Sequence, residues 1–210
     1  MSHGTLYIVS APSGAGKTSL VRALLERLDD IQVSVSHTTR AMRSGEADGI
    51  NYHFVDQATF KRMIERGDFF EHAQVFDNHY GTSRPAVQAL LAAGTDVILE
   101  IDWQGARQVR EQMSGMVSVF ILPPSREALR ERLSSRGTDD ASVIDRRMRD
   151  AISEMSHFDE YDYVVVNDNF EEALAQLTGL VIAERSRLER VRERQGPLIQ
   201  ALLSRIEGVE

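Results

Sequence analysis

Residues 11–18 (APSGAGKT) are the feature that most restricts how this chain can fold. They directly follow a short run of β-branched and apolar residues, 5–10, which is typical of a buried strand. They precede leucines at positions 20, 24, 25 and 28, which are spaced as on one face of a helix. The order strand, glycine loop, helix is the arrangement that aims consecutive backbone N–H groups and the helix dipole at a phosphate.

The same segment predicts a phosphate site, because it matches the Walker A pattern except that Ala11 replaces the first glycine. Gly14 and Gly16 would let the backbone close around phosphate oxygens, while Lys17 would place a charge at the β and γ phosphates. Thr18 would offer its hydroxyl to Mg²⁺. A glycine-rich turn with a solvated lysine is the structural alternative. Of the 24 basic residues only positions 17 and 61 are lysine, and a compact ammonium suits this site better than a planar guanidinium.

Length and composition exclude several classes of protein. A chain of 210 residues has room for one core of ordinary size, so a single domain with insertions is expected. The formal charge of −8 opposes binding to nucleic acid or anionic lipid. The absence of cysteine excludes disulfides and thiol catalysis. We find no signal peptide and no apolar stretch of membrane-spanning length, which predicts a cytoplasmic protein.

Helices and strands alternate along most of the remaining chain, as in a parallel sheet covered by helices. Residues 84–93 are predicted as a helix, 96–101 and 117–122 as apolar strands with a helix from Gly105 between them, and 163–166 as a further strand. A helical stretch, 125–148, interrupted at Gly137, and then another helix precede that last strand. The final helix is expected to begin near Phe170 and to be interrupted at residues 196–197. Residues 33–84 differ, because alternating, aromatic-rich segments surround one helix, 57–66, which Asp56 could cap and Gly67 could end.

Seven arginines and five acidic residues lie between positions 126 and 149, which makes this segment net positive within an acidic protein. For Arg126, Arg130 and Arg149 a solvated face with ion pairs one turn apart is the favoured interpretation. For Arg132, Arg136 and Arg147 we favour convergence on one phosphate cluster, since arginine suits the charge that develops during phosphoryl transfer.

A second concentration of phosphate-type ligands lies at residues 36–52 (SHTTRAMRSGEADGINY), followed by FFEHAQ, YGTS and ILEIDWQG around positions 71, 82 and 100. In order and spacing, the chain from about residue 4 to residue 168 resembles the guanylate kinase family. The resemblance implies a P-loop NTPase three-layer α/β fold with a central parallel sheet, an inserted mostly-β GMP-binding lobe and a helical arginine-rich lid. The implied divisions are a core (1–36, 85–124 and 150–184), the lobe (37–84), the lid (125–149) and a C-terminal helical tail (185–210).

The resemblance also implies a role for each matching residue. The GMP phosphate would be held by Arg40, Arg43, Tyr52 and Tyr80, and guanine would be read by Ser36, Glu71 and Thr82, with Glu100 and Asp102 nearby. ATP would be bound by Ala11, Pro12, Ser13, Gly14, Ala15, Gly16, Lys17 and Thr18, together with Arg132 and Asn167. The catalytic set would be Lys17, Arg43, Arg136 and Arg147, with Thr18 as the metal ligand.

Some of these residues have structural alternatives. Tyr52 and Tyr80 could be core aromatics of the lobe, and Asp102 could cap the helix that follows it. Trp103 is expected to serve packing rather than chemistry. Glu71 has a chemical rationale of its own, because a carboxylate accepts from guanine N1–H and N2–H, whereas adenine offers no such pair of donors.

The expected reaction is attack of a GMP phosphate oxygen on the γ-phosphorus of ATP, which gives GDP and ADP, with dGMP as a second acceptor, in purine nucleotide metabolism and GMP recycling. A phosphate monoester is mostly a dianion at neutral pH, so no general base is needed. Another Walker-type kinase of small metabolites and a non-catalytic, phosphopeptide-binding module are the alternatives. Whether the chain forms a homo-oligomer stays open.

Overall fold

A five-stranded parallel sheet forms the centre of the protein, in the order β2-β7-β1-β8-β9. The computed structural model describes residues 3–75, 77–134 and 140–204. Side chains of β1 are buried on both faces of the sheet, as expected for a strand covered by helices on both sides. The strands are β1 (Leu6–Ser10), β2 (Ile31–Val33), β7 (Asp96–Glu100), β8 (Val117–Leu122) and β9 (Tyr163–Val166).

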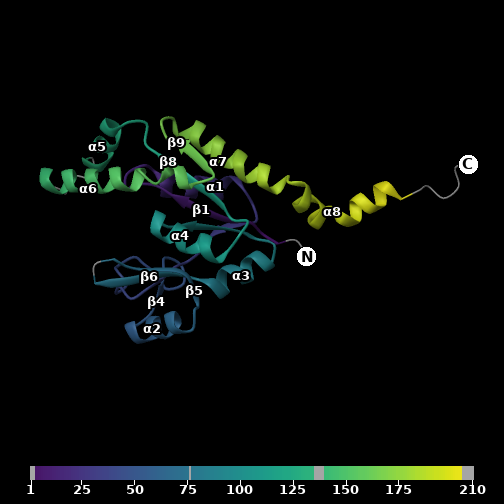
Figure 1. Cartoon of the computed structure of the whole chain (residues 1–210), viewed down its shortest axis with the longest axis horizontal. Coiled ribbons are helices and arrows are strands. Elements are labelled where there is room, and N and C mark those ends of the chain that lie inside the picture. The colour runs from purple at the N-terminus through teal and green to yellow at the C-terminus, as the bar shows by residue number, and fades with distance from the viewer. Residues whose placement is uncertain (1–2, 76, 135–139, 205–210) are drawn as a thin grey trace, which may run out of the picture.

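Helices cover both faces of this sheet, which gives three layers (Figure 1). On one face, Tyr7 and Val9 of β1 pack with α1 (Lys17–Arg27) and α7 (Phe170–Arg185). On the other, Leu6 and Ile8 pack with α3 (Arg84–Ala92) and α4 (Trp103–Gln112). The α/β fold with a central parallel sheet, predicted from the alternation of helices and strands, is confirmed.

A second, four-stranded sheet lies below the core in Figure 1, in the order β4-β3-β6-β5. Its strands are β3 (His37–Thr38), β4 (His53–Phe54), β5 (Phe69–Val75) and β6 (Asn78–Ser83), and α2 (Gln57–Glu65) packs on it. Asp56 Oδ1 accepts from the Thr59 N–H at 2.6 Å, and Gly67 follows the helix with φ +70°. The predicted mostly-β insertion is therefore present, with the expected residues at both ends of its helix.

Two glutamines of α4 attach this second sheet to the core. The Gln108 side chain accepts from the His72 backbone N–H at 3.1 Å and donates to the His72 carbonyl at 3.3 Å. Gln112, one turn later, donates to the Phe70 carbonyl at 2.6 Å. Because these bonds satisfy backbone groups on the outer edge of β5, they fix the position of Glu71 relative to α4.

The arginine-rich segment forms α5 (Arg126–Ser134) and α6 (Ala141–Met155), and the predicted interruption at Gly137 lies outside the described residues. The sequence predicted helix to Met148 and then a separate helix, but α6 is continuous across that point. Met148, Ala151 and Met155 all face α5, where they pack with Leu129 and Leu133, so the apolar face continues without a break. A short 3₁₀ turn, η1 (Phe158–Glu160), precedes β9.

The C-terminal part differs from the single interrupted helix that the sequence predicted. α7 ends at Arg185, extended backbone at Arg187 separates it from α8 (Leu188–Leu203), and α8 itself contains a non-helical residue, Gln195, just before Gly196. Figure 1 shows α8 projecting away from the sheets. Within the described ranges, no helix is long and apolar enough to cross a membrane.

Candidate active site

The loop between β1 and α1 lies at the carboxyl end of the central strand. Gly14 and Gly16 have φ of +92° and +94°, in the left-handed region that favours glycine. The Ala15 N–H donates to the Pro12 carbonyl at 3.1 Å, which closes the turn, and α1 begins at Lys17. Backbone N–H groups at the start of α1 therefore face a common point together with the positive end of the helix dipole, as in an anion site.

Asn167, which directly follows β9, is hydrogen-bonded to the backbone of this loop. The Asn167 side chain is buried and donates from Nδ2 to the Ala15 carbonyl at 2.7 Å. The backbone carbonyl of Asn167 accepts from Arg132 Nη2 at 3.0 Å. A Cβ added to Gly16 would lie 2.4 Å from Asn167 Nδ2. Position 16 must therefore be glycine for two reasons, the backbone conformation and the space that the Asn167 amide occupies.

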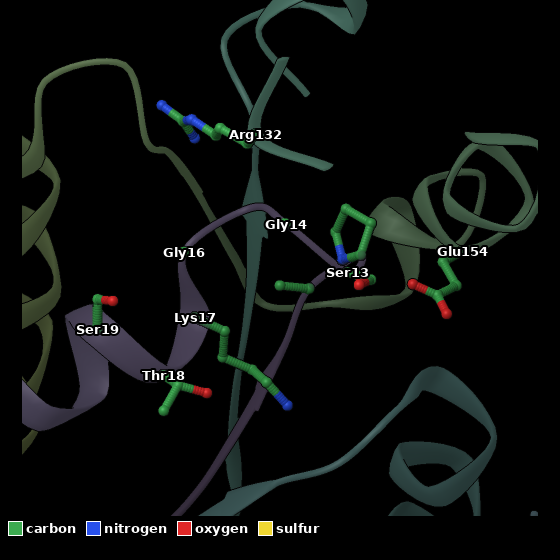
Figure 2. A pocket seen from close by; sticks show the side chains of 10 residues that line it. Ser13, Gly14, Gly16, Lys17, Thr18, Ser19, Arg132 and Glu154 are labelled. Carbon is green, nitrogen blue, oxygen red and sulfur yellow. The ribbon is translucent and has the colours of Figure 1, made fainter. Parts of the chain in front are cut away.

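A cavity of about 400 Å³ lies over the loop. Arg132 of α5 and Glu154 of α6 line it beside the loop residues, and Figure 2 shows these two side chains on different sides of the loop. Arg147 of α6 donates from Nη2 to Ser13 Oγ at 3.0 Å. The lining thus combines loop residues with residues from both arginine-rich helices: Ala11, Pro12, Ser13, Gly14, Gly16, Lys17, Thr18, Ser19, Arg132 and Glu154.

Lys17 and Thr18 share a carboxylate partner at the end of the neighbouring strand. Glu100 is the last residue of β7 and stands beside Val9 in the sheet register. Its Oε2 accepts from Thr18 Oγ1 at 3.1 Å and lies 3.9 Å from Lys17 Nζ. Burial lowers the pKa of Lys17, and the carboxylates of Glu100, Asp102 and Glu154 act in the opposite direction.

A second cavity, of about 520 Å³, is lined in part by the same two residues. Lys17 and Thr18 line both cavities, and Glu100 lines the second. The remaining lining comes partly from the core and partly from the inserted lobe: Val33, Ser34, Ser36, Glu46, Ile50, Asn51, Tyr52, Thr82 and Leu99. Two polar cavities therefore meet at one ammonium and one hydroxyl.

Arg40 is held tightly by its neighbours in the lobe. Its Nη1 and Nη2 donate to the two carboxylate oxygens of Glu46 at 3.0 and 2.7 Å, and Nη1 also donates to the Ala41 carbonyl at 2.8 Å. The guanidinium lies 5.4 Å from the ring centre of Tyr52, and the rings of Tyr52 and Tyr80 are 5.9 Å apart. The structure therefore gathers Arg40, Tyr52 and Tyr80 into one cluster, in which Glu46 fixes the arginine fork.

Glu71 lies buried on β5 and faces Thr82 of β6. The strand pairing shifts between Phe69 and Glu71, so Glu71 stands directly opposite Thr82, whose hydroxyl donates to Glu71 Oε1 at 2.6 Å. The other oxygen, Oε2, lies 3.3 Å from where a Cβ on Gly105 would be, so glycine there leaves room for the carboxylate. Burial raises the pKa of Glu71, and the nearby Asp102 raises it further, while Thr82 lowers it.

Most of the residues singled out in the sequence lie around these two cavities, with a few differences in detail. Asp102 caps α4, as its structural alternative required, and accepts from the Gly105 N–H at 2.8 Å. The Asn167 side chain bonds to the loop backbone and does not line either cavity. Arg43 is exposed, with its backbone N–H bonded to Glu46. Arg136 lies outside the described residues.

Outside the cavities, two other expectations can be compared with the structure. Trp103 stacks on His157 at 3.6 Å, in agreement with its expected packing role. Arg130 forms its ion pair with Asp145 of α6 at 2.6 Å, so the pair joins two helices instead of spanning one turn. Sequence reasoning missed Glu46, Gly105 and Glu154. Glu46 and Gly105 lie within motifs that it had singled out, whereas no local pattern marks Glu154.

Comparison with known proteins gives a consistent answer. A sequence model of guanylate kinase matches residues 3–184. A guanylate kinase of Chromohalobacter salexigens is 72% identical over 209 residues, covering 100% of this chain and 97% of the relative. One of Alkalilimnicola ehrlichii is 63% identical over 205 residues, covering 98% and 99%. The crystal structure of guanylate kinase from Anaplasma phagocytophilum superposes with a TM-score of 0.73 at 37% identity and covers 95% of each chain. The chain belongs to the guanylate kinase family.

Proposed function

We propose that this protein transfers the γ-phosphoryl group of ATP to GMP and releases GDP and ADP. The observation that carries this proposal is that two polar cavities share Lys17 and Thr18. A hydrolase needs one nucleotide site, whereas a kinase needs a donor and an acceptor site that meet where the phosphoryl group is transferred. Membership of the guanylate kinase family supports GMP as the acceptor.

The donor site in this proposal is the cavity over the glycine loop. The backbone of residues 11–18 would cradle the phosphates, and Lys17 would contact the β and γ groups. Arg132 lines this cavity and Arg147 bonds to Ser13, so both would reach phosphate oxygens after small side-chain movements. Asn167 would stabilise the conformation of the loop through its hydrogen bond to the Ala15 carbonyl.

The acceptor site is the second cavity together with the Arg40 cluster and Glu71. Arg40, Arg43, Tyr52 and Tyr80 would hold the monophosphate, since guanidinium and phenol groups donate to phosphate oxygens. Glu71, held by Thr82, would accept from the guanine edge. Ser36, Glu100 and Asp102 would complete the site. Tyr52 and Tyr80 are only partly buried and both interact with Arg40, which supports this role over simple core packing.

Two oxygen atoms beside Lys17 could serve as ligands of a hard divalent cation. The Thr18 hydroxyl and a Glu100 carboxylate oxygen are 3.1 Å apart, and oxygen ligands of these kinds suit Mg²⁺, which takes its other ligands from substrate phosphates and water. Thr18, with Glu100 beside it, would hold the ion. When bound, Mg²⁺ neutralises charge on the transferring phosphates.

Catalysis in this site consists of positioning and charge neutralisation. A GMP phosphate oxygen forms the new bond to the γ-phosphorus while the bond to the β-γ bridging oxygen breaks, and ADP leaves with that oxygen. No base is needed, because the acceptor phosphate has its second pKa near ~6 and is mostly dianionic at pH 7. Lys17, Arg43, Arg136 and Arg147 would offset the repulsion between the two polyanions.

Several finer points belong to the same proposal. We extend the acceptor to dGMP, because the proposed contacts are made to guanine and to the phosphate. The reaction would place the protein in purine nucleotide metabolism and GMP recycling, and we propose the cytoplasm as its location. A scaffold function is disfavoured because Lys17, Thr18 and Arg147 all lie at the donor cavity.

A coupled assay of ADP release with GMP, AMP, UMP and dTMP tests the proposal. GMP is expected to be the preferred acceptor by at least ~100-fold, in line with sites whose buried polar groups require a matching partner. Lys17→Ala should abolish transfer without unfolding the protein. Lys61→Ala is the matched control, because it removes the other lysine, which is exposed on α2. Comparable rates with all four acceptors, or near-normal turnover of Lys17→Ala, would contradict the proposal.

A further inference from the structure

Glu154 lines the donor cavity but has no role in the reaction as described so far. It belongs to the last turn of α6 and is half-buried, and the Ser13 backbone amide and the Lys17 ammonium both act to lower its pKa. Figure 2 shows its side chain directed toward Ser13 at the edge of the glycine loop. A carboxylate is thus placed in a cavity whose other features favour anions.

The placement follows from the helix. Arg147 and Glu154 are seven residues apart, about two turns, so they share one face of α6. Arg147 bonds to the Ser13 hydroxyl at 3.0 Å, while Glu154 approaches the Ser13 N–H. Met148 and Ala151, next to this face, pack α6 against α5. α6 therefore contacts the same loop residue with one cation and one anion.

Two groups of the glycine loop stabilise the negative charge of Glu154, while burial and two nearby carboxylates oppose it. Burial raises the pKa of Glu154, and Asp102 and Asp150 raise it too, while the Ser13 amide and the Lys17 ammonium act to lower it. The two stabilising groups, a loop N–H and the loop lysine, are the kind of group that binds nucleotide phosphates. Glu154 and a donor polyphosphate therefore compete for the same partners.

We infer that Glu154 is a positioning residue that acts as an internal anion: it holds the glycine loop when no nucleotide is bound and weakens the binding of ATP and ADP. The inference rests on the proposed donor site. Its consequence is faster ADP release, because the carboxylate is ready to regain its contact with Ser13 as the phosphates leave. A residue that merely braced the loop would have the opposite effect, since its loss would weaken nucleotide binding.

Glu154→Gln tests this inference, because glutamine keeps the size and an acceptor oxygen but removes the charge. Calorimetric titration of the variant with ADP and with ATP, both with Mg²⁺, should give dissociation constants roughly tenfold lower than in the wild type, as expected for removing one like charge close to a polyphosphate. Stopped-flow displacement should show slower ADP release. Unchanged or weaker nucleotide binding would overturn the inference.

Asp150→Asn is the matched control. It removes one charge from the same helix, one turn before Glu154, at an exposed position that does not line the cavity. We expect less than a twofold change in ADP affinity, so tightening equal to that of Glu154→Gln would point to overall charge and overturn the inference.

Glu154→Asp supplies a second test that does not depend on the glutamine variant folding. It keeps the charge but shortens the side chain by one methylene, so the carboxylate should compete less well at Ser13 and ADP affinity should rise by less than in Glu154→Gln. Weaker ADP binding by the aspartate variant would indicate a brace. If the wild type itself failed to bind ATP, the proposed function would fail; if it binds ATP and the variants bind no better, only the role of Glu154 fails.

Discussion

Glu71→Gln is the substitution that examines acceptor recognition most directly. The Glu71 side chain is buried, its Oε1 accepts from the Thr82 hydroxyl at 2.6 Å, and its Oε2 lies beside Gly105. A glutamine would fit the same space. Since the Thr82 hydroxyl already donates at this position, the amide oxygen is expected to take the place of Oε1, and the NH₂ group would then face the guanine edge.

The expected magnitude follows from that orientation. The donors on guanine N1 and N2 would meet another donor, so at least one hydrogen bond to a charged acceptor is lost, which is worth about 1.5–3 kcal/mol. A value near ~3 kcal/mol corresponds to a fall of about 100-fold in kcat/KM for GMP. The kcat/KM for AMP should not fall, because adenine has no pair of donors on this edge for the Glu71 carboxylate to accept from. Discrimination between the two acceptors should therefore fall by at least the same factor.

The pH dependence gives a second readout. Burial raises the pKa of Glu71, so its carboxyl group becomes protonated at a higher pH than an exposed glutamate and then loses its acceptor function. The ratio of wild-type to variant kcat/KM for GMP should fall toward one as the pH drops through that raised pKa. Titration of the substrate phosphates affects both proteins equally and cancels in the ratio.

The assay is ADP release with GMP and AMP over a range of pH, with Glu65→Gln as the control. Glu65 is an exposed residue of α2, so its substitution should leave both acceptors unaffected. Unchanged selectivity in Glu71→Gln, or a ratio independent of pH, would show that the buried carboxylate does not read guanine.

Two further predictions concern the loop and the stability of the protein in acid. Gly16→Ala should lower the free energy of unfolding, measured in urea, by about 2–3 kcal/mol, because alanine is strained at this positive φ and displaces the Asn167 amide. Gly179→Ala in α7 is the control: its Cβ would meet open space, so the substitution should stabilise the protein by ~0.5–1 kcal/mol. Equal effects of the two substitutions would refute the steric reasoning. Glu160 pairs with Arg107 and then His157, which lowers its pKa to about 2, so its contribution is present above its ordinary value of 4.5 and is lost as the pH falls toward 2. After allowance for solvent contact we expect about 1 kcal/mol, measured as the extra loss of wild-type stability between pH 6 and 3 relative to Glu160→Gln; identical losses would contradict it.

The parts of this protein that could be predicted from sequence are those whose cause is local. The buried strand before the glycine loop and the apolar runs at β7 and β8 indicated a parallel sheet, because such strands are covered on both faces. Asp56 marked the start of α2 through its own side chain. In the lobe, the spacing of Glu71 and Thr82 within recognisable motifs marked both residues. The strand irregularity that sets them opposite each other left no trace in the sequence, since it depends on the pairing of two strands.

For the same reason, the roles of residues that contact distant parts of the chain could not be predicted. Asn167 and Ala15 are 152 positions apart in the chain, so the sequence indicated Asn167 but not its hydrogen bond to the backbone of the loop. Glu154 was missed entirely, because a glutamate in a helix with many charges looks like an ordinary solvated side chain. Its direction toward Ser13 depends on how α6 packs on α5. The anion that we propose to tune nucleotide affinity is therefore a product of helix packing, and a substitution on the apolar face of α6, such as Met148→Ala, should alter ADP affinity without touching the cavity.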